Sequence, residues 1–334
     1  MAKIAFASIY YEKDVLNYTL GRELLQKYSN IPQKVIENHN NIPEMRAKEN
    51  SEFGRMKSNL IIGVRKTHKY VPNEKISDFL VPYTSSGCSA MCLYCYLVCN
   101  YNKCAYLRVF VNREQMLERL IKHSHSSEKE NTYEIGSNSD LVLENLITGN
   151  LQWTIESFAK DGRGKITFPT KFSEVESLTN LRHEGKTIFR MSVNPEDIIR
   201  IYELGTSPLK KRIGAANLMC DAGYPVCILI APVIFVENWE QQYSDLITIL
   251  SQNLSQKVKD QLIIEIIFMT YSFVHRAINA EAFPNTPELF NPEKMTGRGM
   301  GKYSYRPEFR ARGEEFFIDE LNQKLGEAEI AYIC

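Results

Sequence analysis

The chain reads Gly87-Cys88-Ser-Ala-Met-Cys92-Leu-Tyr-Cys95-Tyr96 directly after a predicted strand, Phe79–Tyr83. Thiolates at this CxxxCxxC spacing can hold three corners of an iron–sulfur cubane, which leaves the fourth iron open to a small-molecule ligand. Because the loop follows a strand, we expect it at the carboxyl ends of the strands, where β/α folds place their sites. The stretch therefore predicts both a β/α fold and a cluster at its mouth.

A structural zinc site is the alternative interpretation, with Cys99 or Cys104 as the fourth ligand. Zinc sites favour two C-x-x-C pairs separated by a longer loop, and here only Cys92 and Cys95 form such a pair. No histidine lies between Lys69 and Lys122. The spacing favours the cluster, and a zinc-stabilised nucleic-acid-binding module remains as the non-catalytic alternative.

Bulk composition is that of a soluble globular protein, with 44% hydrophobic and 24% charged residues in a chain of 334. The formal net charge is zero, so charge alone neither supports nor excludes a nucleic-acid partner. No signal peptide is recognisable, and no apolar run approaches the roughly 18 residues that span a bilayer. We therefore expect a cytoplasmic protein whose cysteines are reduced. Five of its eight cysteines fall between Cys88 and Cys104.

Strand-like and helix-like segments alternate from Phe79 onward. The predicted strands are Phe79–Tyr83, Leu107–Val111, Thr132–Ile135, Lys165–Pro169, Thr187–Val193, Val226–Ile234 and Leu262–Met269. The predicted helices are Arg113–His123, Asn150–Asp161, Val175–Asn180, Glu196–Tyr202, Pro208–Ala222 and Trp239–Leu254. This alternation predicts parallel strands joined by crossover helices, in a barrel or in a doubly wound sheet.

Three parts are expected along the chain: a small α/β unit over 1–80, the barrel over 81–290 and a basic C-terminal part over 291–334. The predicted elements of the first part are strands Ile4–Tyr11, Val35–Glu37 and Leu60–Arg65, helix Val15–Tyr28 and a polar loop Asn38–Ser58. The last part carries cations between aromatics and glycines, then helix Glu314–Leu325 and strand Ile330–Ile333. Cations that neutralise phosphates and aromatics that stack on bases are typical of a DNA-binding surface.

Several longer words carry a specific resemblance. They are Tyr18-Thr-Leu-Gly21-Arg-Glu-Leu, Ile62-Gly-Val-Arg-Lys-Thr67, Cys92-Leu-Tyr-Cys-Tyr-Leu97, Thr170-Lys-Phe172, Phe189-Arg-Met-Ser-Val-Asn194, Gly205-Thr-Ser-Pro-Leu209, Ala222-Gly-Tyr-Pro225, Ala231-Pro232 and Gly299-Met-Gly-Lys-Tyr303. On these words the chain resembles the spore photoproduct lyase family of the radical S-adenosylmethionine superfamily. The resemblance implies an α/β fold, a partial (β/α)6 barrel of the TIM type with a small N-terminal α/β unit and a C-terminal β-hairpin.

The resemblance also implies the activity: a light-independent carbon–carbon lyase that repairs 5-thyminyl-5,6-dihydrothymine in DNA to two thymines. In that family a reduced [4Fe–4S] cluster cleaves S-adenosylmethionine, and the resulting 5′-deoxyadenosyl radical abstracts hydrogen from the lesion. An electron donor such as flavodoxin or ferredoxin, a monomer, no membrane partner and a location in the cytoplasm of the spore or germinating spore are expected with it. The alternative is a related radical enzyme that acts on another lesion or substrate.

Site residues follow from the resemblance position by position. Cys88, Cys92 and Cys95 are expected to bind the cluster, and Tyr94 and Tyr96 to relay hydrogen, although both rings could also be packing around it. The expected contacts to S-adenosylmethionine are Ser139, Asp140, Lys171, Ser192, Asn194 and Ala231. The expected contacts to DNA are Arg298, Lys302, Tyr303 and Tyr305.

Two positions depart from the family pattern. Ser137 occupies the place of the family's hydrogen-donor cysteine, and an alcohol O–H bond is too strong to give hydrogen to a thymine allyl radical. Our hypothesis is that Cys99 has taken over this role; the alternative is that Cys99 is an ordinary thiol and repair is slow or error-prone. The hairpin lacks one aromatic, because Arg298 is followed directly by Gly299.

Overall fold

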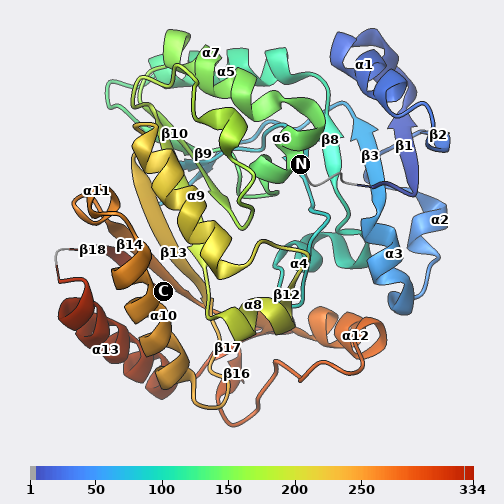
Figure 1. Cartoon of the computed structure of the whole chain (residues 1–334). Coiled ribbons are helices and arrows are strands. Elements are labelled where there is room, and N and C mark those ends of the chain that lie inside the picture. The colour runs from blue at the N-terminus through green and yellow to red at the C-terminus, as the bar shows by residue number, and fades with distance from the viewer. Residues whose placement is uncertain (1–4, 327) are drawn as a thin grey trace.

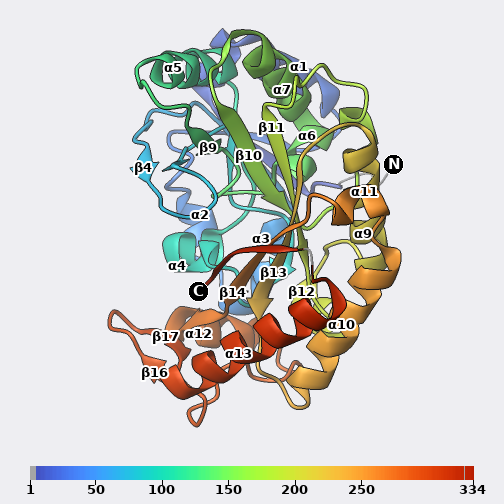
Figure 2. The same ribbon diagram turned by 90° about the vertical axis from the view of Figure 1, so that its left-hand side faces the viewer.

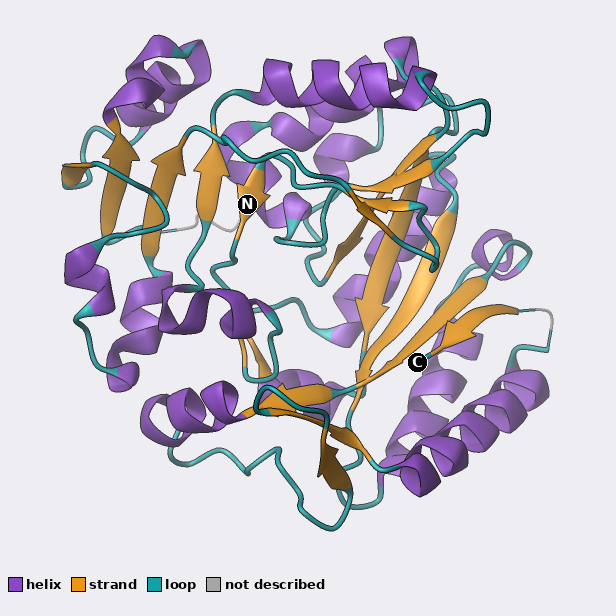
Figure 3. Cartoon of the chain, turned by 180° about the vertical axis from the view of Figure 1, so that it is seen from behind, coloured by secondary structure: helices purple, strands orange, loops and turns teal. Residues whose placement is uncertain are grey.

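Two β-sheets lie side by side in the computed structural model, which describes residues 5–326 and 328–334 (Figure 1). The smaller sheet has the order β2-β1-β3-β8-β6 and is seen from behind in Figure 3. Its strands are β1 (Ser8–Glu12), β2 (Gln33–Ile36), β3 (Asn59–Gly63), β6 (Ser85–Ser86) and β8 (Arg108–Phe110). The predicted start of the first strand at Ile4 lies outside the described residues.

The N-terminal sheet is built largely as expected, with two corrections. Helix α1 (Thr19–Lys27) packs Leu24 against the buried apolar residues of β1 and β3. The prediction of a loop over Asn38–Ser58 was wrong. This stretch contains α2 (Pro43–Arg46), a 3₁₀ turn (Asn50–Glu52) and α3 (Phe53–Lys57). Each of them is too short to show helical periodicity in the sequence. The strand at Leu107–Val111 exists as β8, but it pairs with β3 here instead of joining the barrel.

The larger sheet curls into half a barrel (Figure 2) and has the order β18-β14-β13-β11-β10-β9-β5-β4. Its strands are β4 (Val71–Pro72), β5 (Phe79–Leu80), β9 (Thr132–Glu134), β10 (Lys165–Thr170), β11 (Thr187–Val193), β13 (Val226–Val233), β14 (Ile263–Phe268) and β18 (Glu329–Ile333). All neighbours pair in parallel except β4 with β5. Parallel strands with crossover helices are thus confirmed.

Helices cover the outer face of the curled sheet, so the strands between them are almost continuously buried (Figure 2). They are α5 (Arg113–His125), α6 (Leu141–Thr148), α7 (Asn150–Asp161), α8 (Glu196–Tyr202), α9 (Leu209–Asp221), α10 (Trp239–Asn253), α11 (Gln256–Lys259) and α13 (Pro307–Lys324). The helix expected at Val175–Asn180 is only a 3₁₀ turn, Glu176–Leu178. The sequence reading missed α6, whose residues are mostly apolar on every side and therefore show no polar face.

The C-terminal part contains the expected hairpin, β16 (Met295–Gly297) and β17 (Lys302–Tyr305). A third strand, β15 (Thr270–Ser272), pairs with β17 and leads directly into α12 (Phe273–Ala282), which the sequence reading also missed. Pairing crosses both expected boundaries, because β8 joins β3 and β18 joins β14. The division at 80/81 and 290/291 stays a prediction.

Candidate active site at the carboxyl ends of the barrel strands

A cavity of about 300 Å³ opens at the carboxyl ends of the barrel strands. The cysteine loop closes one side of it, and the ends of β9, β10, β11, β13 and β14 form the rest. Predicted site residues among its lining are Cys88, Cys92, Tyr94, Cys95, Tyr96, Ser139, Asp140, Lys171, Ser192 and Ala231. Segments that are more than a hundred residues apart in sequence therefore supply one pocket.

Backbone contacts hold the cysteine loop in place. Gly87 has φ +74°, and a Cβ there would clash with the carbonyl oxygen of Tyr106, so only glycine fits. The buried Lys57 ammonium donates to the carbonyls of Cys88, at 2.9 Å, and Ala105, at 2.7 Å. Further along the loop, β7 (Met91–Cys92) pairs with β12 (Glu203–Leu204). The loop is thereby tied to both sheets.

The three loop cysteines fit an iron–sulfur cluster better than a zinc ion. All three cysteines are free and line the same pocket. No three Cys, His, Asp or Glu side chains in the described ranges lie close enough to share one metal ion. A cubane holds its sulfur ligands farther apart than a zinc ion does, and the expected fourth zinc ligands, Cys99 and Cys104, do not line the pocket.

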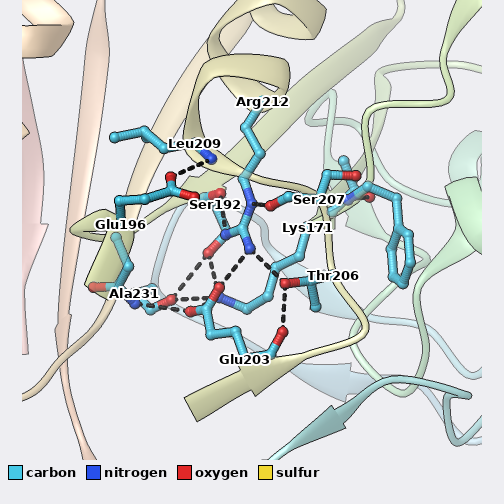
Figure 4. A network of polar contacts seen from close by, with 12 residues as sticks. Lys171, Ser192, Glu196, Glu203, Thr206, Ser207, Leu209, Arg212 and Ala231 are labelled. Atoms are coloured by element: carbon cyan, nitrogen blue, oxygen red, sulfur yellow. Dashed lines mark hydrogen bonds and ion pairs between the residues drawn. The ribbon is translucent and has the colours of Figure 1, made fainter. Parts of the chain in front are cut away.

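Lys171 is the central cation of the pocket wall (Figure 4). It follows β10, and its Nζ donates to Ser192 Oγ at 2.7 Å, to the Ala231 carbonyl at 2.7 Å and to Glu203 Oε1 at 2.9 Å. An ammonium has three N–H donors, so all of them are used. A carboxylate that entered the pocket and bound Lys171 would have to replace one of these acceptors.

Glu203 does not line the pocket itself, but it binds Lys171 and Arg212 beside the pocket wall (Figure 4). Its fully buried carboxylate also accepts from Arg212, at 2.6 Å, from Asn194, at 2.8 Å, and from the Tyr94 hydroxyl. Burial by itself would raise the pKa of Glu203, but Arg212, Lys171 and the hydrogen bonds from Tyr94 and Asn194 lower it to about 2. Glu203 is therefore ionised at neutral pH and balances the two cations beside it.

The two tyrosines of the loop have different surroundings. Tyr94 is buried, and its hydroxyl donates to Glu203 instead of pointing into the open cavity. Tyr96 is 49% exposed and lines both the main cavity and a neighbouring one of about 420 Å³. Of the two, only Tyr96 presents its ring to a space where a second ligand would fit.

The remaining predicted cofactor contacts divide into two groups. Ser139 lines the pocket, and its buried Oγ has no hydrogen-bond partner among the described residues, as expected of a group that awaits a ligand. Asp140 also lines the pocket, but its carboxylate caps α6 and accepts from Thr170 and from the Lys171 amide at 3.0 Å. Asn194 is fully buried behind the pocket, where it contacts Glu203 and Tyr243.

Cys99 does not reach the pocket. Its Sγ lies on α4 (Leu97–Tyr101), 3.5 Å from Ser272 Oγ, and it lines none of the cavities described above. Ser137, in contrast, lines both the main cavity and its neighbour. The structure thus places an alcohol where the family resemblance expects a thiol, and it does not bring Cys99 there.

The hairpin exposes only part of its expected DNA contacts. Arg298 and Lys302 are exposed, Tyr303 is half-buried and packs on Phe290 at a ring distance of 4.5 Å, and Tyr305 is buried. The Tyr305 hydroxyl accepts from the amide of Phe235 at 3.0 Å, which is a contact within the core. At the hairpin tip Met300 is 93% exposed, and sequence reasoning had not singled it out.

Fold and pocket together define a partial-barrel protein with a cysteine-bearing loop at the carboxyl mouth of its sheet. A family model described as spore photoproduct lyase matches residues 5–334. The chain is 34% identical over 332 residues to a protein named spore photoproduct lyase from Bacillus subtilis (strain 168), covering 97% of each, and 29% identical over 335 residues to one from Clostridium acetobutylicum, covering 98% of each. The chain belongs to the spore photoproduct lyase family.

Solved structures agree with this assignment. Spore photoproduct lyase complexed with dinucleoside spore photoproduct matches with a TM-score of 0.92, at 28% identity over 99% of both chains. A mutant of spore photoproduct lyase with bound AdoMet and the same dinucleoside matches equally well, with a TM-score of 0.92. The predicted family and the predicted partial barrel are confirmed.

Sequence reasoning missed Glu203 and Arg212, which shape the pocket without any recognisable motif. Glu203 stands two residues before the family word that starts at Gly205, and Arg212 follows three residues after it ends. The flanking sequence carries little signal, because Arg212 directly follows Lys210 and Lys211 on α9 and Glu203 follows the charged helix α8.

Proposed function

We propose that this protein is a radical S-adenosylmethionine DNA repair lyase, which converts 5-thyminyl-5,6-dihydrothymine to two thymines. The observation that carries the proposal is the convergence of Cys88, Cys92 and Cys95 with Lys171 and the unpartnered Ser139 hydroxyl around one cavity. Membership of the spore photoproduct lyase family supports the substrate class. The structures named for spore photoproduct lyase with AdoMet and dinucleoside spore photoproduct support the pair of ligands.

Each wall of the cavity has a separate task in this proposal. Three thiolates would hold a [4Fe–4S] cluster, and the Lys171 ammonium with the Ser139 and Ser192 hydroxyls would bind the carboxylate and amino ends of S-adenosylmethionine. When bound, cluster and S-adenosylmethionine together supply a 5′-deoxyadenosyl radical. The chain contributes position, because Lys171 and Ser192 are fixed by Glu203 and Ala231 before any ligand arrives.

Exclusion of water is the second contribution of the chain. Apolar side chains dominate the rest of the lining, among them Leu97, Phe172, Leu229, Ile267 and Phe268. A reactive carbon radical would otherwise be lost to side reactions, so a dry wall protects it. Tyr96, half exposed between the two cavities, is the side chain best placed to pass a hydrogen atom between a ligand in one and a ligand in the other.

Ser137 supports a second candidate function. A pocket that is lined by an alcohol in place of a thiol lacks the weak S–H bond that would finish thymine restoration. A related radical enzyme that acts on another nucleic-acid lesion or substrate has no need of that bond. Cys99 as a replacement donor remains a hypothesis, and it requires movement of α4 or of its thiol toward the pocket.

The expected partners belong to the same proposal. We infer a nucleic-acid substrate held by the hairpin, an electron donor of the flavodoxin or ferredoxin type and action as a monomer in the cytoplasm. None of the helices in the described ranges is both long and apolar enough to cross a membrane.

Anaerobic reconstitution followed by two assays tests the proposal. The reconstituted protein should be brown, contain iron and cleave S-adenosylmethionine when dithionite is added; a colourless, zinc-loaded protein would overturn the proposal. Incubation with a dinucleotide or an oligonucleotide that carries the thymine adduct should then yield thymine. Cleavage of S-adenosylmethionine without any change in the adduct would favour the second candidate. Cys92→Ala is the matched loss-of-cluster variant for both assays.

A further inference from the structure

One continuous segment, β15–α12, contacts the cysteine loop on one side and the hairpin on the other. Figure 1 shows α12 beside α3 and α4, and Figure 2 shows the hairpin strands next to its start. The segment also reaches the cavity, because its first residue, Thr270, is part of the cavity lining.

Two side chains of α12 hold the carbonyls of the cysteine loop. Asn279 Nδ2 donates to the Leu93 carbonyl at 2.8 Å, and the His275 ring lies 2.9 Å from the Cys95 carbonyl through Nε2. The two residues are four apart and therefore face the same side of the helix. They hold the backbone at the last cysteine of the motif and two residues before it.

Neighbouring groups define the orientation of the His275 ring. It is 2% exposed and stacks on Tyr271 at a ring distance of 5.0 Å. Because a carbonyl can only accept, Nε2 carries a proton and donates to Cys95, and Nδ1 accepts from the Ser272 hydroxyl at 2.8 Å. The Cys99 thiol then donates to Ser272 Oγ, which gives a directed chain of hydrogen bonds from α4 to the cysteine loop.

The hairpin packs against the other side of the same segment. Tyr271 pairs with Tyr303 and Ser272 with Lys302 in the antiparallel ladder. The amide of Phe273 donates to the Gly301 carbonyl at 3.0 Å. A Cβ at Gly301 would clash with the Phe273 ring, so the hairpin turn rests directly on the first residue of α12.

We propose that β15–α12 couples the hairpin to the cysteine loop, with His275 and Asn279 as positioning residues that transmit the contact. The inference rests on the proposed function, since it takes the hairpin as the nucleic-acid contact and the loop as the cluster site. A nucleic acid that orders the hairpin also orders the segment paired with it. The loop backbone held by His275 and Asn279 then loses conformational freedom before S-adenosylmethionine binds. S-adenosylmethionine therefore binds more tightly, because less conformational entropy is lost when it binds.

Thermodynamic linkage provides the test. The Kd of S-adenosylmethionine for the anaerobically reconstituted protein is measured with and without a saturating double-stranded oligonucleotide that carries the thymine adduct. We expect the oligonucleotide to lower this Kd about fivefold, and S-adenosylmethionine to lower the Kd of the oligonucleotide by the same factor, because coupling is reciprocal. The electron paramagnetic resonance spectrum of the reduced cluster, recorded with and without oligonucleotide, serves as a readout besides binding.

Variants at both ends of the segment locate the coupling. Asn279→Ala removes a donor to the loop, and Phe273→Ala removes the contact with Gly301 from an exposed position. Both should bring the linkage factor close to one and abolish the spectral response to oligonucleotide, while cluster content and the affinity for each single ligand stay near the parent values. Glu281→Ala is the matched control on the same helix and should keep the full factor, because this exposed side chain contacts Asn50 and neither the loop nor the hairpin.

The outcomes separate the two levels of inference. If the parent protein binds both ligands without linkage, or if Asn279→Ala and Phe273→Ala both retain the full factor, the coupling is overturned and the proposed function stands. If the parent protein fails to bind S-adenosylmethionine or the oligonucleotide, the proposed function is overturned, and the coupling with it.

Discussion

At the scale of single residues, Glu203 determines the polar geometry of the pocket. Its carboxylate is bound at once by Lys171, Arg212, Asn194 and Tyr94, and none of these partners is adjacent to it in sequence. Removing one partner of a buried ion pair leaves an uncompensated charge, which typically costs about 3–5 kcal/mol. Glu203 is for this reason the residue whose substitution should affect stability and ligand binding together.

The pKa of Glu203 predicts a pH signature. Its folded-state value of about 2 lies below its ordinary value of 4.5, so the carboxylate stabilises the fold above about pH 4.5 and this contribution is lost as the pH falls toward 2. The contribution is on the order of 3 kcal/mol. We expect Glu203→Gln to lower the free energy of unfolding at pH 7, with a deficit that shrinks below pH 4.5, as measured by urea unfolding.

Asp197→Asn is the control for this measurement. Asp197 forms an exposed ion pair with Arg200, so the same change from carboxylate to amide should alter stability by no more than about 0.5 kcal/mol. A deficit for Glu203→Gln that stays constant from pH 7 to pH 3 would contradict the assigned ionisation of Glu203.

Ser137 and Cys99 allow a test of the final hydrogen transfer. Ser137→Cys places a thiol on the cavity wall, and we expect a larger fraction of the converted adduct to appear as thymine, measured by chromatography of the products. Because the Cys99 thiol faces Ser272, its position predicts that Cys99→Ala leaves the product mixture unchanged. Loss of thymine in Cys99→Ala would instead support Cys99 as the donor.

At the scale of elements, the hairpin has exposed cations at its turn and a buried end where β17 joins the core. Arg298 and Lys302 lie at the turn, whereas Tyr305 anchors β17 to the core through Phe235. The charge of this element is available to phosphates only near its tip, where Met300 is also exposed. Tyr305 was expected to contact DNA, and its burial assigns it a structural contact instead.

The cations of the hairpin should affect the salt dependence of DNA binding. We expect Arg298→Ala and Lys302→Ala each to weaken oligonucleotide binding and to reduce the slope of log K against log salt by about 1, as one phosphate contact would. Lys122→Ala, on exposed α5 at the far end of the molecule, should leave both quantities unchanged (Figure 1). Fluorescence anisotropy at several salt concentrations measures them; an unchanged slope in both hairpin variants would exclude the hairpin as the phosphate contact.

At the scale of the whole molecule, the cysteine loop lies where the two sheets and the segment β15–α12 meet. Lys57 holds it beside the N-terminal sheet, β12 holds it after α8, and α12 holds it from the segment that follows the barrel strand β14. A ligand bound against this loop would therefore be coupled to all three regions through the loop. Its binding energy should stabilise the fold as a unit.

Thermal unfolding measures this stabilisation. S-adenosylmethionine at a hundred times its Kd should stabilise the reconstituted protein by about 2.7 kcal/mol, seen as a rise in Tm. Lys171→Ala should remove most of the rise at the same ligand concentration, while Lys122→Ala should keep it. A full rise in Lys171→Ala would show that the ligand does not use this ammonium.

Local patterns allowed much of the fold to be predicted. Amphipathic periodicity identified α7 and α8 at their observed bounds, and alternation of strands and helices identified the parallel sheet. The short helices between Asn38 and Ser58 were missed because segments of four or five residues are too short to show a period. The strand β8 was assigned to the wrong sheet because sequence order does not specify a pairing partner. The pocket residues nominated by resemblance were mostly brought together, except Asn194 and Cys99.

The sequence alone determined the cysteine loop, the class of fold and the family, because these depend on spacing and on words of adjacent residues. Only the tertiary structure decided which side chains face the cavity. Contacts between segments far apart in the chain decide both cases. The contact with Lys171 puts Glu203 beside the pocket wall, and the contact with Ser272 keeps Cys99 outside the pocket. Such contacts depend on how strands and helices pack in three dimensions, which no local pattern of residues records.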